Sequence, residues 1–231
     1  MTVHCPEVAR EARPGNFVQL RLSGGEILLR RPLGIAGADA KQGSLVFIYR
    51  VLGKGTTAFS ALRPRDRVNV LGPLGHGFRT DWERPLLVGG GMGLSPLLFC
   101  AGVMGEKADV LMGGRCAREM FWETLFRPHV LNTYITTDDG SLGVKGFTVS
   151  LLPELLAGGG YDAVIVCGPE IMMQRTARLA KEAGIPCQVS LERRMACGLG
   201  ACLSCSIDAT DGTRRKVCKD GPVFWAEEVF P

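Results

Sequence analysis

The first eighty residues alternate apolar and polar side chains over short stretches, which is the pattern of half-buried strands. The alternation runs over residues 17–22, 44–51 and, more briefly, 66–71, with glycine and proline between these stretches. Strands of this length and spacing are typical of a small antiparallel barrel. We therefore expect an antiparallel β-barrel domain over residues 1–80.

From about residue 81 the pattern changes to continuous apolar runs followed by segments of helical spacing. The runs cover residues 85–88, 109–112 and 162–167, and a helix is predicted over 169–183. Buried strands that alternate with helices indicate a parallel sheet covered on both faces. We expect an α/β domain over residues 81–190, with a last strand beginning near Val189 and Leu191.

One apolar stretch, residues 85–105, has no charged side chain and approaches the length of a membrane span. Its middle holds four glycines, a serine and a proline, which are poor helix formers there. A strand, a turn and a buried helix fit this composition better. We therefore predict no transmembrane segment.

Charge and cysteine content narrow the classes of function. The chain has 231 residues, 46% of them hydrophobic, and a net charge of +4, which provides no basic stripe typical of nucleic-acid binding. Its nine cysteines are an odd number, and no secretory signal is recognisable at the N-terminus. These features predict a reducing compartment and a cytoplasmic protein.

Four cysteines near the C-terminus have the spacing of an iron–sulfur site. Cys197, Cys202, Cys205 and Cys218 are arranged as C-x4-C-x2-C-x12-C, the plant-type pattern for a [2Fe–2S] cluster. Glycines between them allow a tight loop whose N–H groups point at sulfur. A structural zinc site is the alternative, but zinc ligands usually come in two close pairs. We predict a [2Fe–2S] module over residues 191–231 with these four thiolates as metal ligands.

A strand–turn–helix motif in the α/β domain holds three glycines that resemble part of a dinucleotide fingerprint, namely Gly89, Gly91 and Gly93. Ser95 is expected to cap the following helix, and Pro96 to occupy its first position. A helix N-terminus behind a glycine turn favours a phosphate. A purely structural turn is an equally good interpretation of these residues.

A second turn of this kind, Cys167-Gly168-Pro169, ends another predicted strand. Parallel sheets bind ligands at the carboxyl ends of their strands. Cys167 is therefore a candidate catalytic residue facing the cleft, and a buried packing cysteine is the alternative. Arg115, after the second sheet strand, could meet a 2′-phosphate or could simply be a surface residue.

Basic residues and a glycine–threonine loop in the barrel segment indicate an anion site. Arg31 precedes the rigid Pro32, Arg50 ends a predicted strand, and Gly55 and Thr56 lie at a predicted helix start. Such a loop near an arginine can hold a pyrophosphate. Surface arginine is the ordinary alternative.

Taken together, these features resemble the ferredoxin–NADP reductase superfamily and, within it, the electron transfer subunits of dihydroorotate dehydrogenase B. The matching motifs are RPLG at 31–34, GPLG at 72–75, TDDGS at 137–141, MACGLGAC at 195–202 and VCKDGPVF at 217–224. The resemblance extends from about residue 13 to residue 229.

The resemblance implies FAD on the barrel, NADH on the α/β domain, and electron transfer through the [2Fe–2S] cluster to an FMN-containing dihydroorotate dehydrogenase catalytic subunit in a heterotetramer of pyrimidine biosynthesis. The implied FAD contacts are Arg31, Pro32, Leu33, Gly34, Ile48, Tyr49, Arg50, Gly55 and Thr56. The implied nicotinamide contacts are Gly89, Gly91, Gly93, Cys167, Gly168 and Pro169.

Two departures from the family pattern affect these expectations. The flavin motif usually has Ser where this chain has Gly34, which removes one hydroxyl contact. The family also has a barrel strand before the equivalent of Arg13, and Pro6 interrupts the few residues available for it here. We therefore expect that the barrel is open at that edge, that the partner completes it, or that the start codon is misplaced.

Two other functions are compatible with these motifs. One is a sister subunit serving a sulfide-, hydrogen- or NADP-linked enzyme, and the other is a redox-sensing or zinc-binding interaction module.

Overall fold

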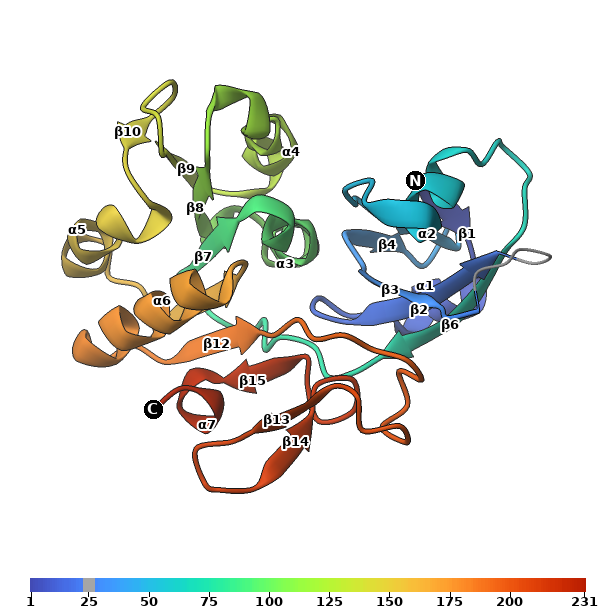
Figure 1. The fold of residues 1–231 in the computed structure, drawn as a ribbon. Helices are drawn as coiled ribbons and strands as arrows, with labels where there is room; N and C mark the ends of the chain where they lie inside the picture. The colour runs from blue at the N-terminus through green and yellow to red at the C-terminus, as the bar shows by residue number, and fades with distance from the viewer. Residues whose placement is uncertain (23–27) are drawn as a thin grey trace.

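The computed structural model describes residues 1–22 and 28–231, and small antiparallel sheets form its N-terminal part (Figure 1). One sheet has the order β1-β5-β4, with β1 (Thr2–His4), β4 (Gly37–Asp39) and β5 (Ser44–Val46). The other has the order β3-β2-β6, with β2 (Phe17–Leu22), β3 (Arg31–Gly34) and β6 (Val68–Leu74). The helices here are α1 (Pro6–Glu11) and α2 (Gly53–Ser60).

Two expectations for this part are corrected. The residues before Arg13 do form a strand, because β1 pairs antiparallel with β5, and Pro6 lies in the first turn of α1. The strand expected over 44–51 ends at Val46. The alternating pattern continues beyond Val46, but Ile48 and Tyr49 line a cavity instead of extending the sheet.

The predicted parallel sheet is present, with the strand order β10-β9-β8-β7-β11-β12-β15. Its strands are β7 (Pro85–Gly90), β8 (Asp109–Gly114), β9 (Asn132–Thr137), β10 (Val144–Lys145), β11 (Ala163–Cys167), β12 (Cys187–Ser190) and β15 (Val223–Trp225). All neighbouring pairs are parallel except β12 and β15. The apolar runs correspond to β7, β8 and β11, which confirms the period-based prediction.

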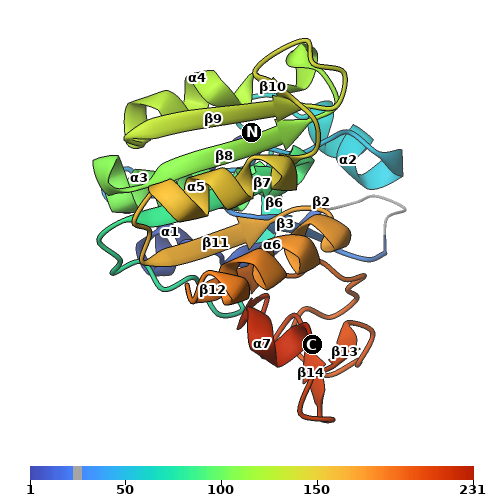
Figure 2. The same ribbon diagram turned by 90° about the vertical axis from the view of Figure 1, so that its left-hand side faces the viewer.

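Helices cover both faces of this sheet (Figure 2). The helices α3 (Leu94–Met104) and α4 (Trp122–Phe126) pack on one face, and α5 (Leu152–Gly158) and α6 (Glu170–Glu182) pack on the other. Alternate residues of one strand serve the two faces: Val164 and Val166 pack with α5 and α6, and Ile165 packs with α3. No helix in the described part of the chain is long and apolar enough to cross a membrane.

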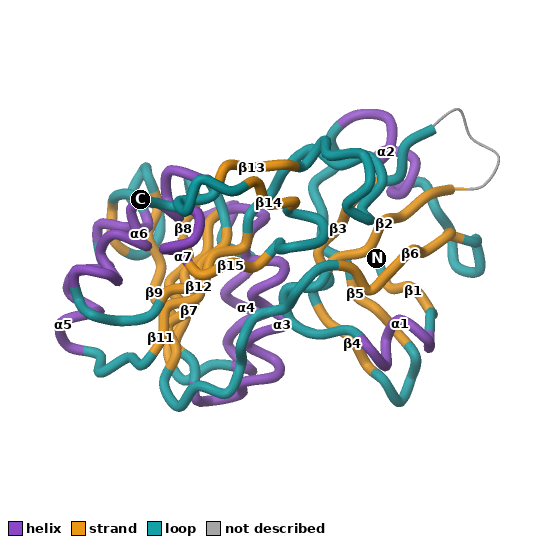
Figure 3. Tube along the Cα trace, turned by 90° about the horizontal axis from the view of Figure 1, so that it is seen from below, coloured by secondary structure: helices purple, strands orange, loops and turns teal. Residues whose placement is uncertain are grey.

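The C-terminal segment lies against both the N-terminal sheets and the large sheet (Figure 3). Its hairpin consists of β13 (Ser206–Asp208) and β14 (Arg214–Lys216), and β15 leads into α7 (Ala226–Val229). Strand β15 joins the edge of the large sheet beside β12, and just before it the His76 N–H donates to the Gly221 carbonyl at 2.6 Å. This segment therefore contacts both the sheet and the chain that leaves the N-terminal part.

Strand β2 has two different buried faces. Val18 and Leu20 pack into the core of the N-terminal part, whereas Phe17 packs in the same cluster as Cys205 and Cys218. Side chains of a strand alternate between its faces, so Gln19 lies on the side of Phe17. The C-terminal segment thus covers a sheet face that would otherwise meet solvent.

Candidate functional site

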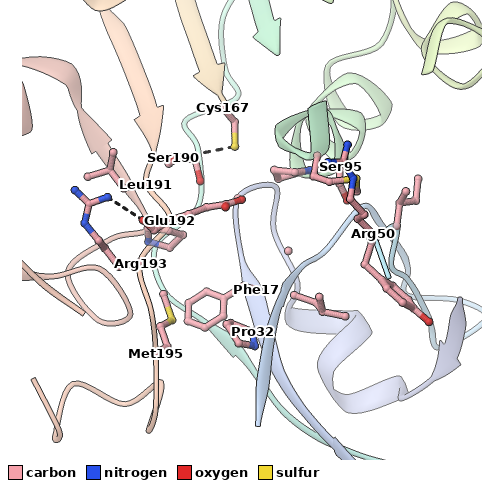
Figure 4. Close-up of a pocket in the computed structure, with 18 of the residues that line it drawn as sticks. Phe17, Pro32, Arg50, Ser95, Cys167, Ser190, Leu191, Glu192, Arg193 and Met195 are labelled. Carbon is pink, nitrogen blue, oxygen red and sulfur yellow. Dashed lines mark hydrogen bonds between the residues drawn. The ribbon is translucent and has the colours of Figure 1, made fainter. Parts of the chain in front are cut away.

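A cavity of about 290 Å³ lies where the N-terminal part, α3 and the chain after β12 meet (Figure 4). It brings together most of the predicted flavin residues, namely Pro32, Leu33, Gly34, Ile48, Tyr49, Arg50 and Thr56. Further residues line it that were not expected at a flavin site, among them Phe17, Ser95, Ser190, Glu192, Arg193 and Met195. Ser95 and Met195 belong to motifs noted in the sequence, but neither motif points to this cavity, and only folding places the six residues together.

Strand β3 brings the RPLG motif against the start of α3. A Cβ atom at Gly34 would lie 3.8 Å from the Cβ of Pro96, which is ordinary contact distance. The backbone of Gly34 is not in a conformation reserved for glycine. The absent side chain therefore leaves room in the cavity wall that a hydroxyl could fill.

Arg31 and Gly55 do not line this cavity but contact each other beside it. The Arg31 guanidinium lies where a side chain at Gly55 would have to be, so a residue larger than glycine would displace it. Thr56, the next residue, lines the cavity, and its hydroxyl accepts from the Leu52 N–H at 2.6 Å. A cation against the first turn of α2 has the chemistry of an anion site.

Ser95 is not the helix cap that the sequence suggested. A 3-10 turn, Gly91–Gly93, runs directly into α3, which starts at Leu94 with Gly93 at the N-cap position. Ser95 is 4% exposed, and its hydroxyl has no hydrogen-bond partner among the described residues. An unpaired buried hydroxyl beside a cavity is the kind of group that a bound ligand satisfies.

The two glycine-containing turns meet at the carboxyl end of the sheet. A side chain at Gly93 would collide with the carbonyl of Cys167, and Gly168 has a φ of +153° that favours glycine. Gly91, Gly93, Gly168 and Pro169 line one shallow cavity together with Arg50. Gly89 lies outside it, and its missing side chain makes room for Leu94.

Cys167 ends β11 and lines the cavity near Ser190 (Figure 4). It is 1% exposed, and its Sγ lies 3.8 Å from the Ser190 carbonyl oxygen, to which the thiol donates. Burial, with the charge of Glu192, raises the pKa of this thiol far above its usual range. Cys167 is therefore a neutral thiol, which can pack against a ligand but does not act as a thiolate.

A second cavity, of about 520 Å³, continues along the end of the sheet from Arg50. Gly90, Gly113 and Gly114 form part of its wall, and Arg115, Glu119, Asp138 and Arg175 supply charge. Arg50 lines both cavities, and none of the ion pairs of the described residues includes it. Its guanidinium is thus available to a ligand that spans the two.

The four predicted metal ligands lie in one loop region. The Cys202 N–H donates to Cys197 Sγ, and the Cys218 N–H donates to Cys205 Sγ, both at 3.4 Å. Backbone N–H groups point at their sulfurs: the Gly200 N–H donates to Cys218 Sγ at 3.1 Å, and the Leu199 N–H donates to Cys197 Sγ at 3.3 Å.

The chemistry of this donor set suits two irons better than one zinc ion. Gly198 and Gly200 have φ of +74° and +80°, as expected of glycines that turn N–H groups toward sulfur. The Ser204 hydroxyl and nearby N–H groups lower the pKa of the exposed Cys202 to about 6, which favours the ligating thiolate.

Comparison with known proteins identifies relatives over nearly the whole chain. Residues 192–230 match the family described as the iron–sulfur cluster binding domain of dihydroorotate dehydrogenase B. The electron transfer subunit of dihydroorotate dehydrogenase B (NAD(+)) from Geobacillus thermodenitrificans is 40% identical over 96% of this chain and 88% of its own length. The protein of the same name from Desulforamulus reducens is 37% identical over 99% and 91%.

Solved structures show the same fold. The structure of an NADH-dependent reduced ferredoxin-NADP oxidoreductase, described in connection with flavin-based electron bifurcation, is similar with a TM-score of 0.85 and 33% identity over 99% of this chain and 83% of that one. A ferredoxin NADP+ reductase from Neisseria gonorrhoeae with bound FAD and NADP has a TM-score of 0.55 at 15% identity, over 75% of this chain and 80% of that one. The architecture is therefore ferredoxin–NADP reductase-like with an added iron–sulfur domain.

Proposed function

Because this chain belongs to the family of dihydroorotate dehydrogenase B electron transfer subunits, we propose that it carries electrons between NADH, FAD, a [2Fe–2S] cluster and an FMN-containing catalytic subunit. The observation that carries the proposal is the placement of the C-terminal cysteine loop against β2, directly beside the cavity formed by the RPLG strand. When bound, nicotinamide exchanges electrons in pairs as hydride, the cluster exchanges them singly, and flavin does both.

We assign FAD to the first cavity and to the anion site next to it. Pro32, Leu33, Gly34, Ile48 and Tyr49 provide an apolar wall for the ring, and the unpaired Ser95 hydroxyl offers it one hydrogen bond. Arg31, Gly55 and Thr56 hold the diphosphate at the first turn of α2. On this assignment the antiparallel sheets of residues 1–80 form the flavin barrel.

NADH is assigned to the end of the parallel sheet, within residues 81–190. Gly91 and Gly93 let the dinucleotide approach the backbone, and Arg50 offers its guanidinium to the diphosphate. Cys167, with Gly168 and Pro169, packs against the nicotinamide ring and excludes water from it. Gly89 acts indirectly, because it allows α3 to pack close to β7.

Residues 191–231 would hold the cluster through Cys197, Cys202, Cys205 and Cys218. Two leucines near the exposed Cys202, Leu199 and Leu203, are 57% and 61% exposed. Exposed apolar side chains around a redox centre suit a docking surface for the catalytic subunit of a heterotetramer. We also propose a cytoplasmic location, which the odd number of cysteines in the sequence supports.

The test is reconstitution under anaerobic conditions. The purified chain should contain two irons and one FAD, and NADH should bleach the flavin spectrum. Mixed with the FMN-containing subunit from its own organism, it should support NAD⁺ reduction by dihydroorotate. A chain that binds iron and flavin but supports no such reaction would contradict the choice of partner.

A second candidate is a subunit that serves a ferredoxin- or NADP-linked enzyme. The similarity to the NADH-dependent reduced ferredoxin-NADP oxidoreductase favours it, because that likeness covers 99% of this chain. The same preparation distinguishes the two. Co-purification with a ferredoxin- or NADP-reducing partner, without dihydroorotate oxidation, would establish the second candidate.

A further inference from the structure

Gln19 is a completely buried amide without a partner. It lies in the middle of β2 with 0% of its surface exposed. Neither its Oε1 nor its Nε2 forms a hydrogen bond with any described residue. A buried polar group left unpaired costs about 1–3 kcal/mol, so each such group in a folded protein requires an explanation.

The side chain of Gln19 reaches the cysteine loop. Its Cγ and Nε2 come within 2.8 and 3.0 Å of the position that a Cβ at Gly198 would occupy. Gly198 directly follows Cys197, and its φ of +74° turns the loop at this point. A larger residue at 198 would therefore push the amide away from the loop.

The other neighbours of Gln19 do not satisfy its amide. Apart from Gln19, the nearest side chain to the Cβ position of Gly198 is that of Leu74, which has no polar atom. Pro32 pairs with Gln19 across β3 and has no N–H group to donate. Gln19 is also absent from the lining of the flavin cavity, although Phe17 two residues earlier is part of it. The free amide is thus directed to the cysteine side of β2.

We propose that the side-chain amide of Gln19 donates a hydrogen bond to a sulfur atom of the [2Fe–2S] cluster and thereby raises the reduction potential of the cluster. This inference rests on the proposed function, since it requires the cluster to be bound by the four cysteines. An N–H donor stabilises the more negative, reduced state, and hydrogen bonds to sulfur are an established influence on cluster potentials. Gln19 is a positioning and tuning residue and is not a ligand.

The experiment compares Gln19→Leu, which keeps the volume of the side chain and removes the donor, with the unchanged chain. Gln188→Leu is the matched control, because Gln188 is also buried but its Oε1 accepts from the Arg79 N–H, away from the loop. Each variant is assayed for iron content, for its electron paramagnetic resonance spectrum and for the midpoint potential of the cluster in a dye-mediated titration.

In Gln19→Leu we expect two irons per chain and a midpoint potential lowered by roughly 59 mV, which is a tenfold change in the ratio of reduced to oxidised cluster at a given potential. Gln188→Leu should leave the potential unchanged. Equal potentials in Gln19→Leu and the unchanged chain would overturn the proposal. Absence of iron from the unchanged chain would instead overturn the proposed function.

A measurement on the unchanged chain covers the case in which Gln19→Leu does not fold. Glutamine labelled with ¹⁵N in its side-chain amide is incorporated, and the reduced cluster is studied by pulsed electron paramagnetic resonance. A coupling from the labelled amide supports the hydrogen bond, and its absence overturns it. The other glutamines belong to different elements, because Gln42 lies between β4 and β5, Gln174 in α6 and Gln188 in β12.

Discussion

Arg115 and Glu119 form a closed ion pair at the carboxyl end of β8. Nε and Nη2 of Arg115 both donate to Oε1 of Glu119, at 2.8 and 2.6 Å, and the Arg115 backbone N–H donates to Oε2 at 3.0 Å. These hydrogen bonds hold the pKa of Glu119 below its usual range. The arginine that could have met a 2′-phosphate is therefore already neutralised, and a carboxylate stands beside it in the second cavity.

The chain should for this reason prefer NADH to NADPH, and Glu119→Gln should weaken that preference. Loss of the carboxylate frees Arg115 and removes repulsion of the extra phosphate, so we expect NADPH to bind roughly three- to fivefold more tightly. Stopped-flow bleaching of the flavin by each nucleotide measures the change. Glu123→Gln, which breaks the Arg127 pair on α4 outside the cavity, should not alter the preference.

Ser95→Ala should affect flavin-free and flavin-loaded protein in opposite directions. Removal of an unpaired buried hydroxyl should stabilise the flavin-free chain by about 1 kcal/mol, whereas loss of its bond to FAD should weaken FAD binding by about 0.5–1.5 kcal/mol. Thermal unfolding and flavin titration provide the two readouts. Thr176→Val is the control, because it removes a comparable unpaired hydroxyl from α6 and should leave FAD affinity unchanged. If Ser95→Ala bound FAD as tightly as Thr176→Val, the Ser95 contact would be contradicted.

Gly93→Ala should disrupt the contact between the two glycine turns. A methyl group there meets the Cys167 carbonyl and the Gly168 Cα, which are backbone atoms that cannot move independently. We expect the free energy of unfolding to fall by about 2 kcal/mol or more, measured by chemical denaturation. Gly102→Ala in α3 meets no atom within 4 Å and should instead gain about 0.5–1 kcal/mol. Similar stabilities for the two variants would contradict the packing described.

After removal of iron, one cysteine should react with an alkylating reagent much faster than the others. Cys202 is exposed with a pKa near 6, whereas burial raises the pKa of Cys100 and Cys167. Treatment of the iron-free chain with iodoacetamide at pH 7.5 should modify Cys202 first and leave the two buried thiols intact, as mass spectrometry can show. Iron-loaded protein should resist modification at Cys202. Rapid labelling of Cys167 would contradict its burial.

Features carried by local pattern were predictable from the sequence. The runs that became β7, β8 and β11 are apolar, apart from Asp109 at the start of β8, because both faces of the sheet are covered. The cysteine spacing likewise indicated one shared loop, since the first three ligands lie within nine residues of one another. Both predictions depend on residues that are close together in the chain.

Features that depend on distant contacts were not predictable. Gln19 belongs to an alternating stretch and would be assigned to a solvent face, but a segment nearly 180 residues later covers that face. The strand expected over 44–51 stops at Val46, because Ile48 and Tyr49 turn to the cavity. Ser95 was expected to be a cap, whereas the 3-10 turn before it starts the helix at Leu94, two residues earlier than a cap at Ser95 would allow.

The addition of β15 to the edge of the large sheet has a kinetic consequence. A carrier on a flexible tether delivers its charge at the rate at which it diffuses between docking positions, and that rate falls as the medium thickens. In this chain β15, which follows the cysteine loop, is paired with β12 by backbone hydrogen bonds. The distance between the flavin site and the cluster site is therefore fixed when the chain folds. The rate of electron transfer between these two sites should accordingly be the same in dilute buffer and in concentrated glycerol.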